Sequence, residues 1–77
     1  CISTSGNSQN ILKVLKEAKK TKIYSVSFLG KGGGKAKRLS IKSLVVPSKN
    51  TARIQECHIF LGHFILEKVE DIIISKN

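Results

Sequence analysis

The stretch Ile23-Tyr24-Ser25-Val26-Ser27-Phe28-Leu29 decides the fold class of this chain. It is rich in β-branched and aromatic residues and is followed by Gly30, a composition that predicts a buried strand. A second short run, Ser43-Leu44-Val45-Val46, predicts another strand, which Pro47 ends. The segment between the two runs is predicted to be a glycine-rich loop followed by one helical turn.

Apolar residues at helical spacing from Ile11 to Ala18 predict a helix ahead of the first strand, over about residues 8–20. Asn7 or Ser8 is its expected N-cap. Strands that alternate with helices are typical of a parallel sheet with helices on both faces. The sequence therefore predicts an α/β fold.

The last predicted helix runs over about residues 52–74, with Asn50 or Thr51 as its cap. Its middle, residues 59–66, is apolar nearly all the way round the helix. Such a helix is buried on several sides, in a core or between subunits. His63 lies inside this apolar run and is therefore expected to be largely buried.

We expect the chain to be a fragment of a larger domain. It begins with Cys1 and not with Met, and only Cys1 and Ile2 precede the first loop. A parallel α/β unit places such a loop after a strand, so the first strands of the sheet are expected to be missing. The core that 77 residues can form is then too small to ensure stability in isolation.

The composition excludes several functional classes. The chain has no apolar run of about 18 residues and no signal-peptide pattern, so no membrane association is expected. Its 2 cysteines are too few for a disulfide framework or a structural zinc knuckle.

The net charge of +9 raises the question of nucleic-acid binding. Lys35, Lys37 and Arg38 form a local basic cluster, but the basic residues are otherwise spread over the chain. Tyr24 and Phe28 are expected to be buried in the first strand, so no base-stacking platform is evident. We therefore expect no nucleic-acid partner, and the basic field would instead attract a phosphorylated substrate.

Four hydroxyl side chains stand within six residues ahead of the first helix. Gly6 lets the backbone of this segment approach a ligand, and the helix N-terminus points its free N–H groups at the same place. The pattern is typical of a sugar-phosphate site, although a plain turn with a helix cap has the same composition. The hydroxyls belong to Ser3, Thr4, Ser5 and Ser8.

Gln55, His58 and His63 are polar residues on the otherwise apolar last helix. Gln55 and His63 are eight residues apart, about 12 Å of rise and about 80° of rotation, which is near the limit for sharing one ligand. They could not hold a zinc ion by themselves, because zinc takes about four ligands. His63 fits either a hydrogen-bonded core histidine or a ligand, and spacing does not exclude His58 from the same site.

Three segments together resemble the phosphoheptose isomerases, the sedoheptulose 7-phosphate isomerase branch of the sugar isomerase (SIS) family. The resemblance runs essentially end to end, and the third segment is its most specific part. The segments are residues 2–8, residues 30–35, and residues 51–59 followed by His63.

The resemblance implies a partial SIS-type, flavodoxin-like parallel sheet with flanking helices and a long C-terminal helix, in which residues 1–77 are the C-terminal portion of a single SIS domain. It also implies roles for individual residues. His63 would bind metal and act in acid/base catalysis, and Gln55 would contact both substrate and metal. The substrate phosphate would be held by Ser3, Thr4, Ser5 and Ser8.

The same resemblance implies a zinc-dependent cytoplasmic homotetramer with active sites between subunits. Its reaction converts sedoheptulose 7-phosphate to D-glycero-D-manno-heptose 7-phosphate, a precursor of ADP-heptose and lipopolysaccharide. The family also uses a His and a Glu on an upstream helix that this chain does not contain, so the chain alone is expected to be inactive. The alternative is a non-enzymatic SIS protein that binds a sugar phosphate or a replication initiator.

Overall fold

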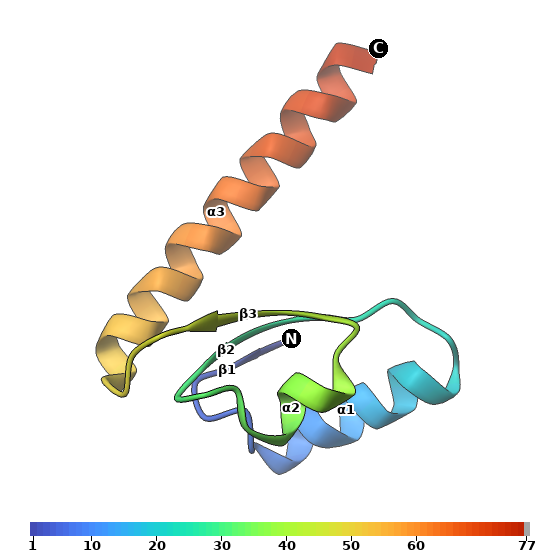
Figure 1. Cartoon of the computed structure of the whole chain (residues 1–77). Coiled ribbons are helices and arrows are strands. Elements are labelled where there is room, and N and C mark those ends of the chain that lie inside the picture. Colours follow the sequence, from blue (N-terminus) through green and yellow to red (C-terminus); the bar gives the residue numbers. More distant parts are fainter. Residues whose placement is uncertain (77) are drawn as a thin grey trace.

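A parallel sheet of three strands, in the order β1-β2-β3, separates two helical layers in this computed structural model, which describes residues 1–76 (Figure 1). Helices α1 and α2 lie on one side of the sheet, and α3 lies on the other and extends away from it. The elements are β1 (Ile2–Ser3), α1 (Gln9–Lys20), β2 (Val26–Gly30), α2 (Gly34–Leu39), β3 (Lys42–Val46) and α3 (Thr51–Lys76).

The strand pairing confirms the predicted α/β class and the parallel sheet. β1 pairs with β2 through Ile2 opposite Phe28 and Ser3 opposite Leu29. β2 pairs with β3 over its whole length. The first loop thus leaves the sheet after Ser3, one residue later than the sequence suggested, and Ser3 itself is a sheet residue.

The core lies between the sheet and the α1–α2 layer. Leu12 and Leu15 of α1, Leu29 of β2 and Ala36 of α2 form one buried cluster. Side chains alternate between the faces of a strand, so Phe28 points to the opposite face, toward α3. Each buried leucine contributes about 1.5–3 kcal/mol of hydrophobic free energy.

The strand predicted from residue 23 begins three residues later, at Val26. The backbone N–H of Ile23 donates to the carbonyl of Ala18 at 2.8 Å and so closes the end of α1. Residues 23–25 are then used to return the chain to the sheet. As a result Ile23 and Tyr24 are exposed, and the prediction that Tyr24 is buried is wrong.

Only the first turns of α3 contact the sheet of this chain. Ile54 and His58 are buried there, whereas most of the large apolar residues further along the helix, including Phe60, Phe64 and Leu66, are exposed. The prediction that His63 is largely buried is wrong, because no part of the described chain covers its side chain, although the preceding Gly62 still lies close to Phe28 of β2. Within residues 1–76, no helix has the length and apolar character needed to cross a membrane.

We predict that Gly6→Ala destabilises the chain far more than Gly32→Ala. Both glycines have positive φ, +72° and +83°, so alanine brings a backbone strain of about 1–3 kcal/mol at either position. A Cβ at Gly6 would also collide with the Gly33 carbonyl, whereas one at Gly32 meets open space.

Urea unfolding followed by circular dichroism, at one fixed chain concentration, measures the difference. We expect Gly6→Ala to lower the free energy of unfolding by at least about 2 kcal/mol more than Gly32→Ala does, because only Gly6→Ala forces an overlap with the backbone. Equal losses of stability in the two variants would show that Gly6 does not pack against Gly33 as described.

Candidate functional site

The loop that joins β1 to α1 is organised by its own hydroxyls. The buried Ser3 Oγ accepts the N–H of Gly6 at 3.0 Å and lies 3.2 Å from Ser8 Oγ. Ser5 Oγ accepts the N–H of Asn7 at 3.1 Å. The structure therefore brings Ser3 and Ser8 together, and the half-buried Thr4 and Ser5 belong to the same tight turn.

Ser8 stands at the N-cap position of α1, as predicted, but its side chain makes no cap hydrogen bond. The first turn of α1 contains no acidic residue either. Asn10 Oδ1 accepts the N–H of Ile11 at 3.0 Å, which leaves the N–H groups of Gln9 and Asn10 without a side-chain cap or a carboxylate. They offer donors and a positive dipole end to an anion beside the Ser8 hydroxyl.

The first turn of α2 supports the hydroxyl loop (residues 4–8, between β1 and α1), a contact that sequence reasoning missed. The carbonyl of Gly6 accepts the N–H of Ala36 at 2.9 Å. Asn7 Oδ1 accepts the N–H of Lys35 at 3.0 Å. The hydroxyl loop and the start of α2 thus fix each other beside the carboxyl ends of neighbouring parallel strands, where α/β proteins place their ligands.

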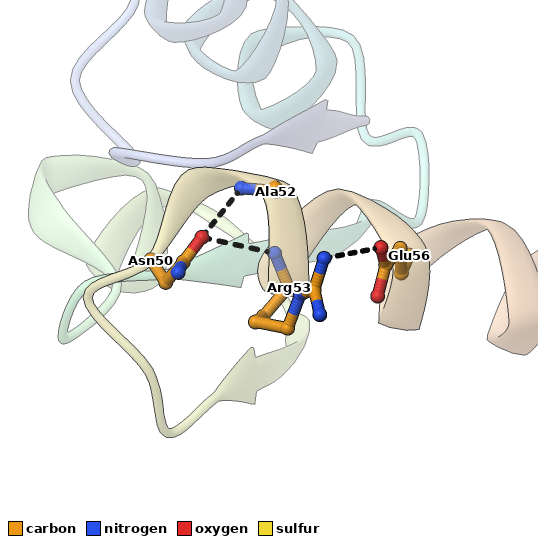
Figure 2. Close-up of polar contacts among 4 residues, drawn as sticks. All are labelled: Asn50, Ala52, Arg53 and Glu56. Atoms are coloured by element: carbon orange, nitrogen blue, oxygen red, sulfur yellow. Dashed lines mark hydrogen bonds and ion pairs between the residues drawn. The ribbon is translucent and has the colours of Figure 1, made fainter.

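The start of α3 is set by Asn50, one of its two predicted caps. Figure 2 shows Asn50 Oδ1 accepting the N–H groups of Ala52 and Arg53, at 3.0 and 3.3 Å. Arg53 forms an ion pair with Glu56 at 2.7 Å on the exposed surface of the same turn. The cap fixes the first turn of α3 and with it the position of Gln55.

Gln55 and His63 line the same groove, which has a volume of about 430 Å³. Eight residues of separation therefore do not prevent them from facing one ligand. Ile2 forms part of the groove wall, so the strand that leads into the hydroxyl loop borders the groove. The remaining lining residues are His58, Ile59, Gly62 and Leu66.

The groove holds part of a metal site at most. An imidazole nitrogen and an amide carbonyl are donors that a zinc ion accepts, and His63 and Gln55 supply one of each. Within residues 1–76, no group of three or more His, Cys, Asp and Glu side chains is arranged to hold a metal. Further ligands would have to come from other protein residues.

His58, and not His63, is the buried histidine of α3. Its side chain is 2% exposed, and its Nε2 lies 2.9 Å from the carbonyl oxygen of Leu29. Its Nδ1 is buried and has no hydrogen-bond partner among the described residues. The signal available in the sequence was the spacing of Ile54, His58 and Leu61, which puts His58 on the face that packs on the sheet.

The parallel sheet, its flanking helices and the long last helix form an α/β fold that is consistent with a partial SIS-type domain. No family model matches the sequence. Curated proteins do match it. The chain is 42% identical over 76 residues to a phosphoheptose isomerase of Aquifex aeolicus and 46% identical over 76 residues to one of Helicobacter pylori strain Shi470. It is 49% identical over 69 residues to one of Clostridium acetobutylicum.

The first two alignments cover 99% of this chain and 40% of each relative, and the third covers 90% of the chain and 35% of the relative. The chain is therefore a match to a segment of the phosphoheptose isomerase family. The alignments extend over the hydroxyl loop as well as over the groove on α3, because nearly every residue of the chain is included.

We predict that Asn50→Ala lowers the stability of the chain by about 1 kcal/mol, because two N–H groups of α3 lose their acceptor. Glu56→Gln is the matched control in the same turn. It removes an ion pair whose side chains are 63% and 61% exposed, so it should change stability by less than about 0.5 kcal/mol. Urea unfolding measures both, and a larger loss for the control would contradict the assigned cap.

Proposed function

We propose that this chain is part of a sugar-phosphate isomerase that converts sedoheptulose 7-phosphate to D-glycero-D-manno-heptose 7-phosphate, on the route to ADP-heptose and lipopolysaccharide. The observation that carries the proposal is the placement of Gln55 and His63 in one groove beside the start of the hydroxyl loop. The identity to curated phosphoheptose isomerases over nearly the whole chain supports it.

The hydroxyl loop is the proposed phosphate site. Thr4, Ser5 and Ser8 offer hydroxyls around a helix start without an acidic residue in its first turn. Ser3 is buried and shapes the turn by holding Gly6. The net charge of +9 assists capture of a dianionic phosphate ester by long-range attraction.

The groove is the proposed site of the carbonyl end of the sugar. Ketose–aldose isomerisation moves a proton between two neighbouring carbons through an enediol, so it needs a base and an acid beside the carbonyl. His63, exposed in the groove, can hold or release that proton at an imidazole nitrogen. Gln55 can orient the substrate through its amide.

Gln55 and His63 are also the residues that would hold a zinc ion, together with ligands from other protein residues. When bound, zinc supplies electrostatic stabilisation of the oxygen that becomes negative during the reaction. The alternative function, a non-enzymatic SIS protein, has no need of this pair, so zinc content distinguishes the two functions.

The proposed assembly is a cytoplasmic homotetramer with sites between subunits. The exposed apolar side chains of α3 support self-association, because a patch of this kind on one chain usually marks a protein interface. They include Ile59, Phe60, Phe64, Leu66, Val69, Ile72, Ile73 and Ile74.

The 77-residue chain by itself should show no turnover of sedoheptulose 7-phosphate. It offers two metal-binding side chains and one acid/base group, which is less than the proposed reaction needs. A coupled assay for the aldose product, with zinc added, makes the measurement. Turnover above the rate in buffer would show that the chain alone holds a complete active site.

In the full-length protein that contains this segment, we predict that His63→Ala lowers kcat by at least about 100-fold, the usual contribution of a proton-transfer group. The inhibition constant of inorganic phosphate should change by less than about threefold, because the hydroxyl loop is intact. Lys20→Ala, on the exposed end of α1, is the matched control and should leave both values unchanged. An unchanged kcat in His63→Ala would remove His63 from the site.

A further inference from the structure

We propose that His58 is a positioning residue, which holds the hydroxyl loop and the Gln55–His63 pair in a fixed relation through one hydrogen bond to β2. The proposal rests on the proposed function for what the two parts bind. It concerns a residue that neither the phosphate contact nor the acid/base chemistry uses.

The hydrogen bond has a defined direction. The Leu29 carbonyl can only accept, so His58 Nε2 carries the hydrogen that spans the 2.9 Å between the two atoms. The ring is 2% exposed and its centroid lies 5.9 Å from that of Phe28. Packing and the hydrogen bond together leave the imidazole one orientation.

The partner of His58 lies in the sheet directly beside Ser3, from which the hydroxyl loop begins. Leu29 lies opposite Ser3 in the register of β1 and β2. Ser3 in turn holds the N–H of Gly6 and lies within hydrogen-bond distance of Ser8. A shift of α3 against Leu29 would therefore be a shift against the phosphate loop.

On α3, His58 stands between the two residues of the groove. Gln55 is three residues before it and His63 five residues after it, and all three line the same groove. Because α3 touches this chain's sheet only in its first half, the His58 hydrogen bond and the packing of Ile54 on Gly30 together set the rotation of the helix about its axis. That rotation decides whether Gln55 and His63 face the ligand.

Packing alone does not explain a histidine at this position. The neighbouring Ile54 fills the same face with an apolar side chain and is completely buried. Histidine instead leaves Nδ1 buried without a partner among the described residues, which is unfavourable. The hydrogen bond from Nε2 to the Leu29 carbonyl, which fixes the orientation of the ring, explains why a histidine is present despite this cost.

The test compares His58→Gln with His58→Phe in the full-length protein that contains this segment. Glutamine restores an N–H donor near the Nε2 position, and phenylalanine keeps the ring volume without a donor. We expect His58→Phe to lower kcat by about 30-fold or more, because a misplacement of about 1 Å can have an effect of about 100-fold. The inhibition constant of inorganic phosphate should stay within about threefold, and His58→Gln should recover kcat to within about fivefold of the parent.

Two results would overturn the proposal: parental kcat in His58→Phe, or equal losses in both variants. If His58→Phe does not fold, ¹⁵N-resolved NMR of the unsubstituted protein decides instead. A proton on His58 Nε2 that exchanges slowly with water supports the proposal, and a bare or rapidly exchanging Nε2 refutes it.

A separate readout keeps this proposal apart from the proposed function. If the unsubstituted protein fails to turn over sedoheptulose 7-phosphate, the proposed function fails. Zinc binding measured by calorimetry then tests His58: we expect weaker affinity in His58→Phe, by about tenfold, as for other residues that orient a metal ligand, and recovery in His58→Gln. Equal affinity in all three proteins, or no zinc binding by any of them, would overturn the positioning role.

Discussion

The pairing of Ser3 with Leu29 is the constraint on which the rest of the structure depends. Ser3 turns the chain out of the sheet and ties the hydroxyl loop together, while the Leu29 side chain enters the core with α1 and the Leu29 carbonyl accepts from His58. A slip of one residue in this register would exchange the two faces of β1, because side chains alternate along a strand. The hydroxyl loop, the core and α3 therefore share one reference point in the sheet.

Most of the fold followed from local patterns. The apolar spacing of α1, the glycine that ends β2 and the Asn50 cap of α3 each leave a mark within a few residues of sequence, and each was predicted near its observed place. The start of β2 was not, because it depends on which acceptor takes the N–H of Ile23. A strand propensity shared by residues 23–29 does not contain that information.

The candidate site was predictable in its residue types and less so in its burial. Gln55 and His63 line one groove, and the buried member of the two histidines is His58. An apolar run predicts that a helix is buried, but it does not indicate whether residues of the same chain bury it. The support that Lys35 and Ala36 give to the hydroxyl loop was invisible for a related reason: it uses backbone N–H groups, which every sequence has.

Two features of this chain that call for further protein contacts lie on the same helix, α3. The groove on α3 presents the two side chains proposed to bind zinc, which takes about four ligands, and the helix beyond the groove exposes a row of large apolar residues. Protein that covered the apolar row would lie next to His63 and Leu66, which stand at the boundary between groove and row. The proposed self-association would thus cover the helix and bring further side chains to the groove at once. In this proposal α3 is the element through which assembly and chemistry depend on each other.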